Sequence, residues 1–175
     1  MVWQKISKIL ECLLGNCSLI NANLPSTKMK VKHSVFFVIK NPLEKDQFLL
    51  VKRPKDDEDL PEVWGLPAGS VKATETFEEA AIRQAKNKLN VEVKIKGFIG
   101  RGTMERKDYT LHGEEFLCSL VQGNPEINKE VEGTIYEEWK WGSLGDLFEA
   151  AEKGSLCSNI LLKNILGNSP VQYNE

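Results

Sequence analysis

The stretch Gly69–Val91, "GSVKATETFEEAAIRQAKNKLNV", places polar side chains at a spacing that suits chemistry. Thr76 followed by Glu79 is a capping-box pair, which predicts that a helix begins there and continues to about Asn90. Within it Gln84, Asn87 and Lys88 stand at i, i+3 and i+4, so they share one sector of the helix surface. Amides carry no charge and an ammonium attracts anions. This surface is therefore predicted to suit a phosphate better than a metal cation.

The spacing of other residues around this helix matches a known motif. The segment "WGLPAGSVKATETFEEAAIRQAKNKLNV" resembles the Nudix box, G-x5-E-x7-R-E-U-x-E-E-x-G-U with U aliphatic. Gly69, Glu75 and Arg83 match its first three fixed positions, and Val91 fits the last. The chain is thereby similar to the Nudix (MutT-like) hydrolase superfamily. The resemblance implies that Gly69, Glu75 and Arg83 hold the loop and helix together.

The same resemblance implies a chemistry whose usual residues are missing. Nudix hydrolases cleave a diphosphate linkage between a nucleoside and another group, and Mg²⁺ or Mn²⁺ neutralises the phosphates. The box supplies the metal with carboxylates. Here these positions hold Gln84, Asn87 and Lys88, so the box is degenerate and whether the protein is an enzyme is left open.

Three functional hypotheses follow. The first is a Nudix-fold protein, a pseudoenzyme candidate with absent or much reduced metal-dependent hydrolysis, that binds a nucleotide or diphosphate-containing ligand. The second is an active hydrolase, requiring Mg²⁺ or Mn²⁺, that uses acids outside the box. The third is a structural or protein-interaction domain. The acids considered for the second hypothesis are Glu114, Glu115, Glu130 and Glu132.

Candidate ligand contacts come from basic and aromatic residues. Arg53 ends a predicted strand and can meet a phosphate, Trp64 can stack on a base, and Lys88 can hold a phosphate in place of a metal. The first hypothesis assigns no metal and no other cofactor.

The elements that must position these residues predict a fold of class α+β. Runs rich in β-branched and aromatic residues predict strands, and the first two, at 31–40 and 47–53, lie at hairpin distance. Further strands are expected at 91–103, 109–123 and 135–141, and further helices at 144–154 and 158–166. The expected architecture is an α/β/α sandwich, a mixed sheet flanked by helices, as the Nudix resemblance also implies.

The remaining expectations concern the whole chain. Residues 1–28 read as an amphipathic segment and linker, and residues 29–175 as the Nudix domain. The net charge of −2, with acids and bases mixed, gives no case for nucleic-acid binding. No segment has the apolar length of a membrane helix, and the four cysteines lack zinc-ligand spacing. A cytoplasmic protein is expected, and a homodimer is compatible with the sequence.

Overall fold

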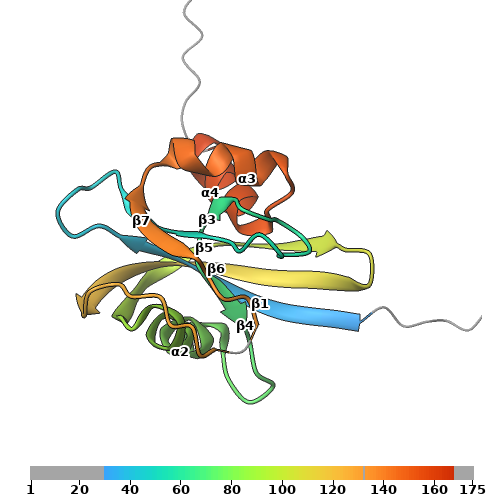
Figure 1. Ribbon diagram of the computed structural model, residues 1–175, viewed down its shortest axis with the longest axis horizontal. Helices are drawn as coiled ribbons and strands as arrows, with labels where there is room; N and C mark the ends of the chain where they lie inside the picture. The colour runs from blue at the N-terminus through green and yellow to red at the C-terminus, as the bar shows by residue number, and fades with distance from the viewer. Residues whose placement is uncertain (1–29, 132, 168–175) are drawn as a thin grey trace, which may run out of the picture.

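The computed structural model describes residues 30–131 and 133–167, which form one mixed sheet between two helical layers (Figure 1). The strands are β1 (Lys30–Lys40), β2 (Phe48–Lys52), β3 (Trp64–Gly65), β4 (Ala68–Ser70), β5 (Glu92–Glu105), β6 (Tyr109–Gln122) and β7 (Glu138–Gly142). The helices are α2 (Phe77–Leu89), the 3₁₀ helix η1 (Leu144–Leu147), α3 (Phe148–Glu152) and α4 (Leu156–Gly167). The predicted α+β class is confirmed.

Strand β1 is the centre of the sheet, whose order is β3-β2-β1-β6-β5. It pairs with β6 in parallel along its whole length, and β4 occupies its other edge at Ser34–Phe36. The expected hairpin between the first two strands meets only at Lys40 and Phe48. Strand β2 pairs instead with β7 along Phe48–Lys52.

Alternation along β1 divides the core between the two helical layers. Val35, Phe37 and Ile39 pack in the cluster that contains the buried face of α2. Phe36 and Val38 point the other way, into the cluster that contains α4. A central strand covered on both faces is apolar throughout its middle, as the run of buried residues from Val35 to Ile39 shows.

Helix α2 begins and ends as its sequence predicts. The Thr76 hydroxyl accepts from the Glu79 amide at 3.2 Å, and the Glu79 carboxylate accepts from the Thr76 amide at 2.8 Å. Both bonds satisfy amides that the first turn leaves unpaired, which confirms the capping box. Asn90 ends the helix in the left-handed conformation, with φ 53°. The helix that carries the motif is thus defined by local interactions.

Helices were expected near both ends of the chain, and only those after β7 lie within the described residues. The predicted helix at 144–154 is divided into η1 and α3, and the predicted helix at 158–166 begins two residues earlier as α4. The amphipathic segment expected within residues 1–28 lies outside the described residues. Within the described ranges, no helix has the length and apolar character needed to cross a membrane.

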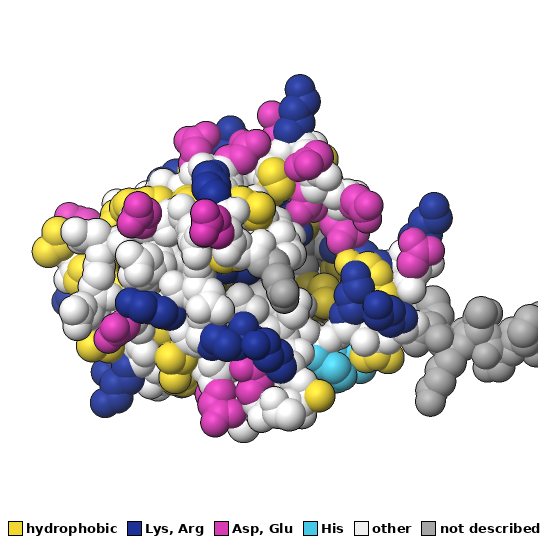
Figure 2. Space-filling model, turned by 60° about the horizontal axis from the view of Figure 1, so that its bottom comes forward, with side chains coloured by type: hydrophobic (Ala, Val, Ile, Leu, Met, Phe, Trp, Pro, Cys, Tyr) yellow, Lys and Arg dark blue, Asp and Glu magenta, His cyan; other side chains and the backbone are white. Residues whose placement is uncertain are grey.

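The surface over the lower part of the molecule mixes charges of both signs. On the face in Figure 2, acidic and basic side chains are interleaved, and histidine side chains lie at one edge. The two histidines, His33 and His112, are neighbours whose ring centroids are 5.6 Å apart. This face shows no broad single-sign patch of the kind that attracts nucleic acid.

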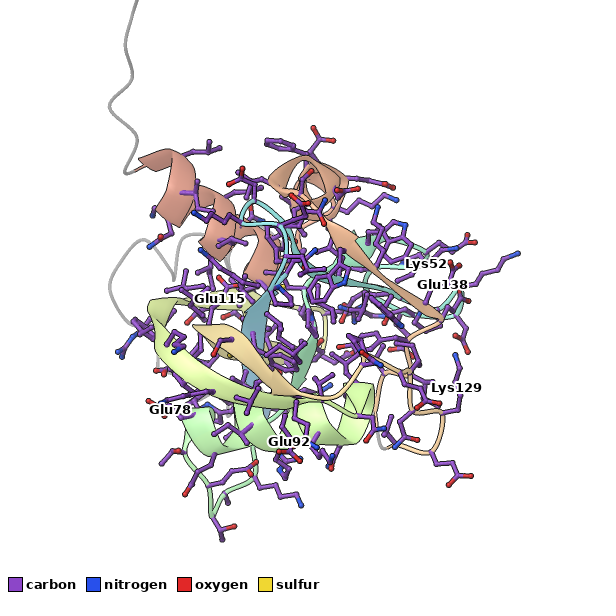
Figure 3. All side chains as sticks on the ribbon, turned by 90° about the vertical axis from the view of Figure 1, so that its left-hand side faces the viewer. Lys52, Glu78, Glu92, Glu115, Lys129 and Glu138 are labelled. Atoms are coloured by element: carbon purple, nitrogen blue, oxygen red, sulfur yellow. The ribbon has the colours of Figure 1, made fainter. Side chains whose placement is uncertain are left out.

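One ionisable side chain lies entirely within the core. Glu115, on β6, is 0% exposed and neither carboxyl oxygen has a hydrogen-bond partner among the described residues (Figure 3). Its register partner Phe36 points into the cluster that contains α4. Because burial penalises the charged form, the pKa of Glu115 rises to about 9. Glu115 is therefore a neutral acid at physiological pH.

This buried acid should make stability depend on pH. The folded state keeps the Glu115 proton to about pH 9, while the unfolded chain releases it near pH 4.5. The free energy of unfolding should therefore fall as pH rises between these values, by up to about 1.4 kcal/mol per pH unit. Glu115→Met should flatten the decline and add on the order of 2 kcal/mol at pH 8.

Urea unfolding between pH 5 and pH 8 measures this effect. Glu114→Gln, at the adjacent and partly exposed carboxylate, is the matched control and should keep the wild-type slope. Equal slopes for wild type and Glu115→Met would contradict a neutral, buried Glu115.

Candidate functional site

The loop before α2 is braced against the helix by an ion pair. Arg83 donates from Nε to one Glu75 carboxylate oxygen at 2.8 Å and from Nη2 to the other. Nη2 also donates to the Ser70 carbonyl at 3.0 Å, and the Lys72 amide donates to Glu75 at 2.7 Å. The Arg83 hydrogen bond, with help from the Lys72 amide, lowers the pKa of Glu75 to about 2. The pair stays charged and fixes the loop.

Gly69 is required by a close approach. The side chain of Gln84 crosses its backbone so closely that a Cβ at position 69 would overlap it. Gln84 is buried, and its Nε2 donates to the Ser70 carbonyl at 3.0 Å. The first of the three degenerate positions therefore holds the loop.

Asn87, the second degenerate position, lies on the exposed side of α2. It stands about 100° from Lys88 around the helix axis, since each residue turns the helix by that angle. The three side chains therefore do not converge on one point, although they occupy one broad sector. Only the third position, Lys88, faces the interior cavity described below.

Lys88 carries a buried positive charge. Lys88 is only 4% exposed, and its Nζ donates to the Thr134 carbonyl at 2.9 Å. Nζ also lies 4.8 Å from the centre of the Tyr136 ring. Burial, together with the charge of Arg53, lowers the pKa of Lys88 to about 8. Among the described residues, no carboxylate lies within ion-pair distance of it.

Lys88 lines a cavity of about 770 Å³. Its wall is formed by parts of β1, β4 and β6, by the loop that follows β2, by segment 133–137 and by the start of α4. Its charged lining residues are the cations Lys32, Arg53, Lys88, Arg106 and Lys129 and the acids Asp56, Asp57, Glu58, Asp59 and Glu137. A cavity of this size accommodates a small molecule.

Two of the cavity cations are paired with acids of the loop that follows β2. Arg53 Nη2 lies 2.8 Å from Asp57, and Arg106 Nε lies 3.7 Å from Asp59. Tyr109 also donates to Asp59 at 2.8 Å, and Asp59 contributes with burial to raising the pKa of Tyr109 to about 12. The acidic loop thus neutralises the arginines and leaves Lys88 without a counterion.

Of the predicted ligand contacts, Arg53 and Lys88 line the cavity and Trp64 does not. Trp64 packs against the cluster on the α4 side, with Lys140 Nζ 4.5 Å from its ring centre. The Trp64 ring is thus engaged in packing and in a cation–π contact outside the cavity.

Of the acids considered outside the box, Glu114, Glu115 and Glu130 do not line the cavity. Glu114 lies 3.8 Å from Arg101 at the surface, and Glu115 is enclosed in the core. Glu130 is exposed and does not line the cavity. Glu132 lies outside the described residues.

Several cavity residues had no clear signal in the sequence. Lys129 and Tyr136 come from the long segment between β6 and β7 and reach the cavity only through the fold. Tyr136 is fully enclosed and bonds through its hydroxyl to both the amide and the carbonyl of Ala68, at 2.8 and 2.9 Å. The five acids at 56–59 and 62 were visible as an acidic loop, but their pairing with the arginines was not.

The degenerate helix face does not fit a divalent metal. It presents an ammonium, an amide that already donates to Ser70 and an exposed amide. Within the described parts of the chain, no three His, Cys, Asp or Glu side chains are grouped to hold a metal ion. Because hard cations need charged oxygen ligands, these three positions are unsuited to metal-dependent catalysis.

Known structures share the fold described above. The MutT protein of Methanosarcina mazei Go1 superposes with a TM-score of 0.66 at 19% identity, covering 83% of this chain and 100% of that one. A MutT Nudix hydrolase of Burkholderia pseudomallei gives 0.63 at 21%, covering 78% and 98%. A C. elegans Ap4A hydrolase binary complex gives 0.57 at 19%, covering 79% and 96%. The sequence finds no match among curated proteins.

The Nudix domain model matches residues 31–159, which includes the strands of the sheet, α2 and most of the cavity wall. The match spans the Gly69–Glu75–Arg83 brace found in the structure. The chain belongs to the Nudix family.

Proposed function

We propose that the protein binds a nucleotide-like ligand through its diphosphate group, with the Lys88 ammonium in the role that the Nudix resemblance assigns to a metal ion. Metal-dependent hydrolysis is absent or much reduced. The observation that carries the proposal is the position of Lys88, which is buried, lines the cavity and lies near no carboxylate in the described structure. Residues 29–175 are proposed as the domain that carries this site.

Electrostatics favours an anion over a cation beside Lys88. Two unit charges about 4 Å apart interact by roughly 4 kcal/mol at an effective dielectric of about 20. A phosphate oxygen gains an attraction of this order, whereas a divalent cation meets about twice this repulsion. No described carboxylate lies within ion-pair distance of the ammonium, so a phosphate bound beside Lys88 would be its first ion-pair partner.

Other cavity groups support a ligand larger than phosphate. Arg106 lines the cavity, and its buried Nε has no hydrogen-bond partner among the described residues. Arg53, although paired with Asp57, lies close enough to Lys88 to contribute to lowering its pKa. The C. elegans neighbour is named for a nucleotide substrate. Together these features favour a nucleotide with an internal diphosphate.

Hydrolysis by acids outside the box is the competing function. The cavity itself holds carboxylates, among them Asp56, Glu58 and Glu137, which are better placed than Glu114, Glu115 or Glu130. A third reading is a domain without a small ligand. Incubation with ADP-ribose, NADH and Ap4A, in Mg²⁺ or in Mn²⁺, separates the three. Product formation supports hydrolysis, binding without products supports the proposal, and neither result supports the third reading.

The first prediction concerns metal binding. Wild type should show no tight Mg²⁺ binding in a calorimetric titration, because the helix face carries an ammonium. The variant Gln84→Glu/Asn87→Glu/Lys88→Glu should bind Mg²⁺ at least about tenfold more tightly, since charged oxygen ligands replace it. Glu78→Gln, on the exposed first turn of α2, is a control that should change nothing. Tight Mg²⁺ binding by wild type would contradict the proposal.

The second prediction concerns pH. Without metal, in EDTA, affinity for ADP-ribose should be flat below about pH 8 and fall above it, by up to about tenfold per pH unit, as Lys88 loses its proton. The diphosphate of ADP-ribose keeps its charge over this range. Lys88→Arg should remove the alkaline decline because a guanidinium stays charged. Lys88→Met should lower the affinity at pH 7 by about tenfold or more.

Fluorescence or calorimetric titrations from pH 6.5 to pH 10 measure both effects. Lys86→Met is the matched control, because Lys86 lies on the exposed side of α2 near Glu92 and should keep the wild-type profile. An unchanged affinity in Lys88→Met would show that the ammonium does not hold the ligand. Thermal unfolding of each variant confirms that it is folded.

A further inference from the structure

The segment that follows β6 is fixed to the end of α2. The Glu126 amide donates to the Leu89 carbonyl at 2.9 Å, and the Asn128 amide donates to the Lys88 carbonyl at 3.0 Å. The Asn128 side chain donates to the Asn87 carbonyl at 2.9 Å. These bonds satisfy carbonyls that the last turn of a helix leaves unpaired. The residue after Asn128 is therefore placed close to the helix turn that carries Lys88.

That residue is a second lysine, which turns toward the same backbone segment as Lys88. Lys129 Nζ donates to the Tyr136 carbonyl at 2.7 Å and lies 3.4 Å from the Glu137 carbonyl. Lys88 Nζ donates to the Thr134 carbonyl, two residues before Tyr136. Both side chains line the cavity. Figure 3 shows Lys129 on the segment that leads into β7, on the side of the molecule away from Glu115.

Unlike the two arginines, Lys88 and Lys129 have no ion-pair partner among the described residues. Arg53 and Arg106 face Asp57 and Asp59. In the described structure, neither Lys88 nor Lys129 has a carboxylate within ion-pair distance, and both donate to uncharged carbonyls. Lys32 is the other cavity lysine, and it lies 3.7 Å from the centre of the Tyr109 ring near the start of β1. The lysine charge in the cavity wall near the end of α2 is thus concentrated in two ammonium groups.

We propose that Lys88 and Lys129 form a two-ammonium site for the diphosphate group, so that Lys129 is a ligand-binding residue. This inference rests on the proposed function and names the residue that completes its site. Lys88 supplies a buried charge at a fixed position. Lys129 supplies an exposed charge on a long, flexible side chain at the rim, where it can leave its carbonyl for a phosphate. Two charges match a diphosphate better than either alone.

Because Lys129 is exposed and Lys88 is buried, their contributions to ligand binding can be measured separately. Salt screens an exposed charge strongly, with a Debye length of about 10 Å at 0.1 M ionic strength and about 3 Å at 1 M. A buried charge is screened much less. The Lys129 contribution should therefore disappear in high salt, while that of Lys88 persists.

Calorimetry with inorganic pyrophosphate in EDTA tests the site on the full chain. Lys129→Gln should weaken binding by about fivefold at low salt and have no effect in 1 M NaCl. Lys94→Gln removes an exposed lysine of β5 that does not line the cavity, and it should bind like wild type.

Each result of these titrations either supports the two-ammonium site or overturns it. If Lys129→Gln binds like wild type while Lys88→Met binds weakly, Lys88 acts alone and the two-ammonium site is overturned, although the proposed function stands. If Lys94→Gln weakens binding as much as Lys129→Gln, the effect is that of the general field and the site is also overturned. If wild type binds neither pyrophosphate nor ADP-ribose, both this inference and the proposed function are wrong.

Discussion

The site depends on one constraint, a positive charge held in the wall of a cavity with no carboxylate within ion-pair distance of it in the described structure. Lys88 reaches that position because it lies one helical turn after Gln84 on the buried side of α2. Its ammonium donates to the Thr134 carbonyl and lies near the Tyr136 ring, which satisfies it without neutralising it. Arg53 nearby makes the position still less favourable for a cation. An anion is the partner that this arrangement lacks.

The structural and chemical parts of the Nudix box are therefore separate in this chain. Glu75 and Arg83 join the loop to the helix, and Gly69 gives the room for Gln84 to cross the backbone. These interactions do not need a metal. Gln84 shows how one degenerate position serves the brace, since its amide bonds to the same Ser70 carbonyl that Arg83 contacts. The interactions that hold the loop on the helix are present, while position 88 carries a lysine where the Nudix box has a glutamate.

Local features could be predicted from the sequence because adjacent residues determine them. The capping box at Thr76, the end of α2 at Asn90 and the Gly69–Glu75–Arg83 spacing all belong to this class. Helical spacing placed Gln84, Asn87 and Lys88 in one sector of the α2 surface, and the structure confirms that sector. The spacing did not show that Gln84 and Lys88 are buried while Asn87 is exposed, because burial depends on the segments that pack against the helix.

The rest of the site arises from contacts between distant segments. Lys129 reaches the cavity because Asn128 bonds to the end of α2, and Tyr136 because its hydroxyl bonds to Ala68. The parallel pairing of β1 with β6 likewise joins segments about 80 residues apart in the sequence, and it encloses Glu115. Sequence periodicity contains no information about these partners. The acids of the cavity could be seen as a charged loop, but their pairing with Arg53 and Arg106 required the fold.

The most direct test of the central claim is to follow the titration of Lys88 itself by NMR, through the side-chain carbon next to the ammonium. The resonance is assigned with Lys88→Arg. In the free protein Lys88 should titrate near pH 8. Saturating ADP-ribose without metal should raise that pKa by at least about one unit, because a bound phosphate stabilises the charged form. A pKa that does not move when the ligand binds would show that Lys88 is not the group that holds it.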